Sequence, residues 1–210
     1  MPTDDSYHQS PRLGVLISGR GSNLQSIIDA IAARRLDATL AVVISNRSDA
    51  PGLQRARDAN VEAVFLNPRE YADRTAYDAA IAHALKSRGV SLVCLAGFMR
   101  LVGPSLLDAF PGRILNIHPS LLPSFPGLDA QRQALDYGVR VTGATVHLVT
   151  SALDAGPIIL QAPAPVLDDD TVDTLSARIL GEEHRLYPEA IQIVLDGRWS
   201  VDGRRFVRRR

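Results

Sequence analysis

Short apolar segments alternate with amphipathic segments along the first half of the chain, and this alternation most restricts the possible folds. The first apolar segment, residues 12–17, is bounded by turn residues and has no polar face, which is typical of a strand buried on both sides of a parallel sheet. Similar segments follow at residues 40–44, 63–66, 92–95 and 114–117. The segments between them carry apolar residues at helical spacing. Those of the two clearest stretches are Leu24, Ile27, Ile28 and Ile31, and Tyr77, Ile81 and Leu85. The pattern predicts an α/β fold, a Rossmann-like, mostly parallel twisted sheet with helices on both faces.

The later part of the chain has a different pattern. Residues 145–149 and 157–161 both look like strands, and only a short connection with no helical spacing separates them. We therefore expect a mixed or antiparallel edge at the C-terminal side of the sheet. Asp170 and Thr171 predict the start of a closing helix, with a break at Pro188 and a stop at Gly197.

Composition and charge exclude several classes of partner. Lys and Arg number 23 and Asp and Glu number 23, so no net field draws the chain to nucleic acid or to a membrane, and small-molecule substrates fit better. No segment approaches the ~18 apolar residues of a membrane span, and the N-terminus lacks the core of a signal peptide. We expect a cytoplasmic protein with one domain at residues 12–199, a disordered tail at 1–11 and a basic tail at 200–210.

Metal and thiol chemistry have no support in the sequence. The single cysteine, Cys94, lies in an apolar strand segment and is interpreted as a packing residue. Without a cysteine cluster or an HExxH motif we expect no metal site. No serine lies in a Gly-x-Ser-x-Gly elbow either, so direct transfer to a bound acceptor is favoured over a covalent intermediate.

A glycine turn runs from the first strand directly into the first helix, at residues 18–25. The free N–H groups and the positive dipole end of such a helix suit a phosphate. The dinucleotide fingerprint would need a third glycine where Leu24 stands and an acidic residue where Asn46 stands, so the turn favours a monophosphate. The alternative is that Ser22 only caps the helix, through a capping box with Gln25.

The predicted strand at residues 114–117 and the residue after it carry two polar side chains. Its period places Asn116 and His118 on one face, at the strand end where open α/β sheets bind ligands. An amide donor beside an imidazole suits acyl transfer, with Asn116 holding an oxyanion and His118 moving a proton. Asp154 is the candidate carboxylate partner of the ring. The alternative is a core histidine and an unrelated turn aspartate; His147 is interpreted as a packing or supporting residue.

Four motifs, in this order and spacing, resemble the phosphoribosylglycinamide formyltransferases, folate-dependent enzymes of purine synthesis. They are residues 19–23 (GRGSN), 96–100 (AGFMR), 116–123 (NIHPSLLP) and 154–157 (DAGP). The resemblance extends from about residue 13 to residue 199, and the third motif is specific to folate formyltransferases and their relatives.

The resemblance implies a reaction and its residues. The amine of glycinamide ribonucleotide attacks the formyl group of the co-substrate 10-formyltetrahydrofolate. Asn116, His118 and Asp154 are then catalytic, with Asp154 keeping His118 protonated and oriented. The ribonucleotide site is implied at Gly21, Ser22, Asn23 and Glu183. The folate site is implied at Arg74, Met99, Arg100, Leu101, Val102 and Asn116.

Relatives of the same fold leave other functions open. The enzyme that formylates initiator methionyl-tRNA adds a second domain and usually carries an arginine-glycine pair where this chain has Ser124 and Phe125. Formyltetrahydrofolate deformylase usually adds a domain before the first strand and is the runner-up enzyme. A non-catalytic nucleotide-binding regulator is the alternative from another class. A monomer and a homodimer are equally compatible with the sequence.

Overall fold

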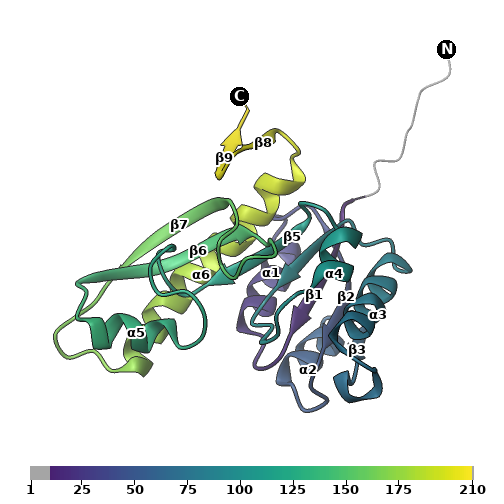
Figure 1. Cartoon of the computed structure of the whole chain (residues 1–210), viewed down its shortest axis with the longest axis horizontal. Helices are drawn as coiled ribbons and strands as arrows, with labels where there is room; N and C mark the ends of the chain where they lie inside the picture. Colours follow the sequence, from purple (N-terminus) through teal and green to yellow (C-terminus); the bar gives the residue numbers. More distant parts are fainter. Residues whose placement is uncertain (1–9, 210) are drawn as a thin grey trace.

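The structure, a computed structural model, describes residues 10–209, and Figure 1 shows how its elements are arranged. Within these residues nine strands form one sheet, in the order β3-β2-β1-β4-β5-β6-β7-β9-β8. The strands are β1 (Arg12–Ile17), β2 (Thr39–Ser45), β3 (Ala63–Phe65), β4 (Leu92–Leu95), β5 (Ile114–His118), β6 (Val141–Leu148), β7 (Ile158–Pro165), β8 (Trp199–Asp202) and β9 (Arg205–Arg208). The helices are α1 (Ser22–Ala32), α2 (Pro51–Asp58), the 3-10 helix η1 (Pro68–Glu70), α3 (Arg74–Lys86), α4 (Pro104–Ala109), α5 (Ala130–Tyr137) and α6 (Val172–Leu195).

Strands β1 to β5 are parallel, as the apolar segments predict. Strand β1 pairs with β2 on one side and with β4 on the other, and β3 and β5 extend the sheet outward. The chain therefore reverses its direction of travel across the sheet between β1 and β4. In open α/β sheets, ligands bind outside the carboxyl ends of the strands at such a reversal.

Both faces of the parallel part are buried, which explains why its strands lack a polar face. On one side Leu13, Val15 and Ile17 of β1 pack in a cluster with helices α1, α2 and α6. On the other side Leu16 packs in a second cluster with helices α3 and α4. Figure 1 shows the long α6 running along β6 and β7, with α3 and α4 at the opposite end of the molecule.

The C-terminal side of the sheet is mixed, as expected. Strand β6 is antiparallel to β5, with Asn116 paired to His147 and His118 paired to Thr145. Strand β7 is antiparallel to β6 in turn. The prediction of an antiparallel edge is confirmed, and its consequence is that β6 places a histidine directly beside Asn116.

Two expectations for the C-terminal part differ from the structure. Helix α6 begins after Thr171, which forms a capping box with Thr174, but it continues through Pro188 to Leu195. A proline inside a helix removes one backbone hydrogen bond, and here the burial of Pro188 and its neighbours compensates. The segment expected as a basic tail instead forms the hairpin β8–β9, in which Trp199 stacks on Phe206. The expected N-terminal tail lies mostly outside the described residues, and β1 begins at Arg12.

No helix within residues 10–209 is long and apolar enough to cross a membrane.

Candidate active site

Three groups of the residues proposed from the sequence lie at the carboxyl edge of the parallel strands, whereas Glu183 lies within α6 and Asp154 in the loop between β6 and β7. The glycine turn follows β1, the segment from Met99 follows β4, and Asn116 and His118 lie near the end of β5. Leu95 pairs with Asn116, so the segment after β4 begins next to β5. One edge of the sheet therefore carries all three groups of predicted residues.

The Asp154 carboxylate lies between two imidazole rings. Its Oδ2 is 3.5 Å from His118 Nδ1, and its Oδ1 is 3.7 Å from His147 Nε2. The side chains are 9%, 6% and 2% exposed for Asp154, His118 and His147, so these charges are little screened by water. The alternative of an unrelated core histidine and turn aspartate is excluded by this geometry.

Asn116 joins the group through His147. Its Nδ2 is 3.2 Å from His147 Nε2, and His147 Nδ1 is 3.0 Å from the carbonyl oxygen of Leu148. A carbonyl oxygen only accepts, so Nδ1 carries the ring proton and the lone pair of a neutral His147 lies on Nε2. Asn116 Nδ2 donates to that lone pair, which fixes the amide and leaves its second N–H free.

A second carbonyl fixes the tautomer of His118. His118 Nε2 lies 2.8 Å from the carbonyl oxygen of Phe125, in the loop between β5 and α5. By the same reasoning, the neutral ring carries its proton on Nε2 and its lone pair on Nδ1, the nitrogen that faces Asp154. The same loop also reaches the carboxylate, because the Gly127 N–H donates to Asp154 Oδ2 at 2.8 Å.

Burial has the largest effect on the pKa of His118. Burial lowers the pKa of His118 below its ordinary value, and this outweighs the opposite effects of the Phe125 carbonyl and of the Asp154 charge. Burial raises the pKa of Asp154, but hydrogen bonds and the two neighbouring rings lower it more. The pKa of this carboxyl is therefore below its ordinary value. Asp154 therefore favours the protonated form of His118 while burial opposes it, and the expectation that the ring is kept protonated stays a prediction.

The glycine turn forms the start of α1 without a side-chain cap. Gly21 is the N-cap residue, with a φ of 71°, and a Cβ there would lie 2.7 Å from the Cα of Gly52. Both the positive φ and the close approach of α2 require glycine. Ser22 is the first residue of the helix and makes no capping bond, so the interpretation of Ser22 as a simple cap is wrong. The N–H groups of the first turn stay available for an anion.

Two predicted ribonucleotide residues meet beneath this turn. Asn23 Nδ2 donates to Glu183 Oε2 at 2.6 Å, although the residues are 160 positions apart. Both side chains are buried, and Asn23 Oδ1 has no hydrogen-bond partner. Burial raises the pKa of Glu183, against the opposing effects of Asn23 and of the Arg20 charge. Buried polar atoms without partners are costly, so Asn23 Oδ1 is suited to accept from a ligand.

The segment after β4 exposes apolar side chains beside cations. Met99 is 66% exposed and Leu101 is 57% exposed. The guanidinium of Arg100 lies 5.1 Å from the ring centre of Tyr77, a cation–π contact. The Arg74 side chain lies against Gly103, directly after Val102. The five predicted folate residues of this region thus lie together, with exposed apolar surface that fits an aromatic ligand.

Sequence reasoning missed the backbone contributions of the loop between β5 and α5. The carbonyl of Phe125 and the N–H of Gly127 contact His118 and Asp154, and backbone groups leave no residue-type signal. Ser18 was also missed: its hydroxyl donates to Asn46 Oδ1 at 2.6 Å and accepts from Met99 N at 2.8 Å, tying three strand ends together. A polar residue directly after a buried strand is the signal that could have identified it.

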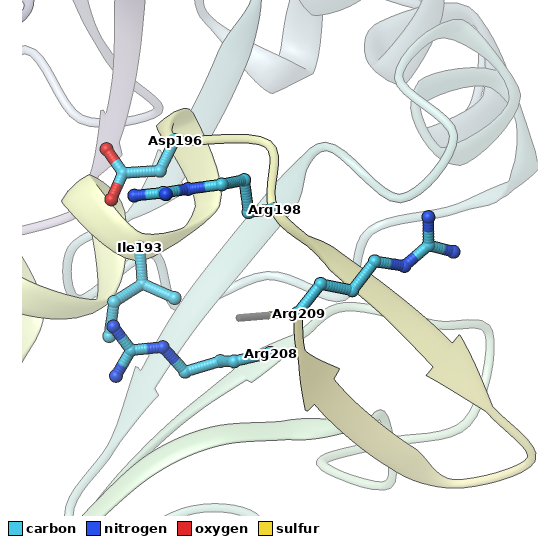
Figure 2. A pocket seen from close by; sticks show the side chains of 5 residues that line it. All are labelled: Ile193, Asp196, Arg198, Arg208 and Arg209. Atoms are coloured by element: carbon cyan, nitrogen blue, oxygen red, sulfur yellow. The ribbon is translucent and has the colours of Figure 1, made fainter.

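Two hollows lie apart from the Asp154 group. One, of about 650 Å³, lies beyond the carboxyl ends of β2 and β3 and includes Arg100. The other, of about 390 Å³, lies between the end of α6 and the β8–β9 hairpin, and Figure 2 shows its side chains. They are Ile193, Asp196, Arg198, Arg208 and Arg209. Among the described residues, no group of three His, Cys, Asp or Glu side chains is placed to hold a metal ion.

Comparison with known proteins identifies the family. The family model described as formyl transferase matches residues 11–191. The chain belongs to the formyl transferase family. It is 47% identical over 187 residues to phosphoribosylglycinamide formyltransferase of Escherichia coli (strain K12), a match that covers 89% of this chain and 88% of that protein.

Solved structures extend the family comparison. The crystal structure of glycinamide ribonucleotide transformylase 1 from Symbiobacterium toebii has a TM-score of 0.95 and 58% identity, and the match covers 97% of this formyl transferase and 96% of that chain. A formyltetrahydrofolate deformylase from Pseudomonas syringae has a TM-score of 0.88 but only 26% identity, over 97% of this chain and 67% of that one. The predicted α/β fold with a mostly parallel sheet is confirmed.

Proposed function

We propose that this formyl transferase moves the formyl group of 10-formyltetrahydrofolate to the amine of glycinamide ribonucleotide. One observation carries the proposal: a buried carboxylate, Asp154, lies between two imidazoles, one of which orients the Asn116 amide. These are the groups that direct acyl transfer needs, a fixed donor for an oxyanion and a proton carrier with a counter-ion. The transformylases to which the chain is 47% and 58% identical support the same acceptor.

Asn116 stabilises the charge that develops on the formyl oxygen. Its orientation is set before the substrates arrive, since Nδ2 already donates to His147. The second N–H of the same nitrogen points away from that bond and donates to the oxygen as the amine attacks. A donor fixed in a partly buried site contributes a factor of about 10² to 10³ to the rate, because it need not reorganise during the reaction.

His118 carries the proton between the two nitrogens. The lowered pKa favours a neutral ring before the reaction, and the neutral ring takes the proton that the attacking amine loses. Asp154 Oδ2, 3.5 Å from Nδ1, stabilises the imidazolium that forms. The imidazolium then gives this proton to the nitrogen from which the formyl group departs. Asp154 thus acts on a charge that exists only during the reaction.

The ribonucleotide binds across the start of α1 and the middle of α6. The free N–H groups after Gly21, together with the helix dipole, bind the phosphate, and Ser22 adds a hydroxyl. Asn23 Oδ1 is unpartnered, and Glu183 uses one carboxyl oxygen for Asn23, so oxygen acceptors remain for the ribose hydroxyls.

The folate binds against residues 99–102 and Asn116. Met99 and Leu101 supply exposed apolar surface for its ring system, and backbone groups of the segment pair with its polar edge. Arg74 and Arg100 supply positive charge for the carboxylates of its tail. When bound, the folate supplies the activated formyl group, and the side chains named here hold it and exclude water.

A spectroscopic assay with purified protein tests the proposal. Formylfolate should be consumed only when glycinamide ribonucleotide is present. The variant His118→Ala should lose most turnover while its ribonucleotide affinity stays within a few-fold, because the ring acts mainly in the transition state. His83→Ala, on the exposed side of α3, is the matched control and should keep full activity. Normal turnover in the His118 variant at saturating substrate would contradict the assignment.

The deformylase reaction is the second candidate, favoured only by the structural match at 26% identity. Consumption of formylfolate without the ribonucleotide would support it, and no consumption under either condition would support a non-catalytic nucleotide-binding regulator. A cytoplasmic location and a monomeric or homodimeric state stay predictions.

A further inference from the structure

The side chain of Gln161 on β7 is bonded to the loop that covers His118. Its Nε2 donates to the carbonyl oxygen of Leu122 at 2.9 Å and to Thr145 Oγ1 at 2.9 Å. A primary amide nitrogen has two N–H groups, so these two bonds use both N–H groups of Gln161. Leu122 belongs to the loop between β5 and α5, whereas Thr145 lies on β6 between that loop and Gln161.

Thr145 connects Gln161 to Ser120 and Leu122 by hydrogen bonds. Its hydroxyl donates to the carbonyl oxygen of Ser120 at 2.7 Å and accepts from Leu122 N at 3.0 Å, in addition to the bond from Gln161. A hydroxyl has one donor and two acceptor positions, so the hydrogen-bonding capacity of Thr145 is filled. The residue is fully buried, and losing one of these partners leaves a polar atom without compensation.

The network continues from Ser120 to the catalytic ring. The Ser120 hydroxyl donates to the carbonyl oxygen of Ser124 at 2.5 Å and lies 3.3 Å from that of Phe125. The Phe125 carbonyl is the acceptor for His118 Nε2. The position of that carbonyl, and with it the ring nitrogen that carries the proton, therefore depends on how firmly residues 120–122 are held.

We propose that Gln161 is a positioning residue for the proton transfer, acting through Thr145 and the 120–125 turn to keep the His118 proton on Nε2. The inference rests on the proposed function for its kinetic consequence, but the tautomer of His118 can be observed in the free protein. With the turn loosened, the Phe125 carbonyl leaves Nε2, and the proton can move to Nδ1, where Asp154 accepts it. The neutral ring then has its lone pair on Nε2 instead of Nδ1.

The variant Gln161→Met tests the proposal, because methionine has similar length and shape but donates no hydrogen bond. We expect kcat to fall about 10-fold, with the KM for the ribonucleotide within about 2-fold, since a loss confined to the chemical step lowers kcat alone. The ¹⁵N shifts of the His118 ring should change from the Nε2–H form of the parent protein to a mixture of tautomers. His118→Gln identifies those signals.

Gln192→Met on α6 is the matched control. Gln192 also makes two side-chain hydrogen bonds: its Oε1 accepts from Asp37 N, and its Nε2 donates to Asp196 Oδ1, so it shares no bond with the Asp154 group. It should leave both kcat and the ring shifts unchanged. If Gln161→Met behaves like this control, or if its KM rises while kcat and the tautomer stay constant, the proposal is overturned. Should Gln161→Met fail to fold, Gln161→Glu also removes both donors and faces the same criteria.

The design separates this inference from the proposed function. If the parent protein transfers no formyl group, the proposed function fails, while the ring shifts still decide whether Gln161 controls the tautomer. If the parent protein is active and the ring shifts of Gln161→Met match those of the parent, only the positioning role fails.

Discussion

Replacing Asp154 by asparagine removes the negative charge beside His118 and keeps the size of the side chain. The two groups are 3.5 Å apart and almost fully buried. At an effective dielectric constant of about 20, a charge pair at this distance interacts by about 5 kcal/mol, which is an upper bound for the loss. The asparagine amide dipole compensates part of it, so we expect the barrier to rise by about 3 to 4 kcal/mol. Each 1.36 kcal/mol is a factor of ten, so kcat should fall by about 10² to 10³.

The same variant has a defined effect on the pH dependence. The charge of Asp154 raises the pKa of His118, although burial dominates and the net direction is downward. Asp154→Asn therefore lowers this pKa further, so the ring stays neutral to lower pH. Since the neutral ring is the active form in the free enzyme, the acid limb of kcat/KM should move to lower pH while the plateau falls.

The measurement is a set of steady-state rates from about pH 5 to about pH 9, the range in which histidine titrates. Ribonucleotide binding is measured in parallel and should change little, because the start of α1 is not altered. A kcat within about 3-fold of the parent would refute the argument that Asp154 acts on a charge formed during the reaction. An acid limb that moves to higher pH would refute the assignment of that limb to His118.

Three further substitutions test separate parts of the site and the fold. Asn116→Leu should lower kcat by about 10² to 10³ by removing the oxyanion donor, which single-turnover rates would measure; an unchanged rate excludes that role. Ser22→Asp should weaken ribonucleotide binding alone, since it sets like charges together at the helix end, and calorimetry with each substrate separates this from general damage. Tyr187→Phe should lower the free energy of unfolding in urea by about 1 to 3 kcal/mol. The fully buried hydroxyl donates to the carbonyl oxygen of Leu95 at 2.9 Å and lies 3.2 Å from that of Leu115. A loss below about 0.5 kcal/mol would show these bonds to be unimportant.

Cys94 illustrates how well burial could be predicted from local pattern. It lies in a continuous apolar segment, and the structure buries it completely beside Tyr187. Burial raises the pKa of its thiol to about 12, so the group is inert as a nucleophile at neutral pH. The parallel strands were predictable for the same reason, because only strands covered on both faces need apolar residues at every position.

Elements with short or polar sequences were not predictable. Helix α2 has only eight residues, and helix α5 is of the same length, so neither gives a strong periodic signal. The sequence of the β8–β9 hairpin predicts a basic tail because arginines dominate its composition. Its order comes from contacts made elsewhere in the chain, such as the bond from Trp199 Nε1 to the carbonyl oxygen of Val194.

The sequence by itself determined which residue types carry the chemistry and the strand that holds two of them. Asn116 and His118 fall on one face of β5 because a strand has a period of two. The glycine turn can be recognised because glycine is favoured at the positive φ of Gly21. These are local properties, set within a few residues along the chain.

Only the tertiary structure decided how these residues meet and in which direction their pKa values shift. Asp154 reaches His118 across 36 positions of sequence, and Asn23 reaches Glu183 across 160. The pKa of His118 depends on its burial beneath the loop that ends at Phe125 and on the competing charge of Asp154. Desolvation and distance are properties of the packed molecule, so no local pattern could show that the pKa of His118 is lowered or that its Nε2 faces a carbonyl oxygen.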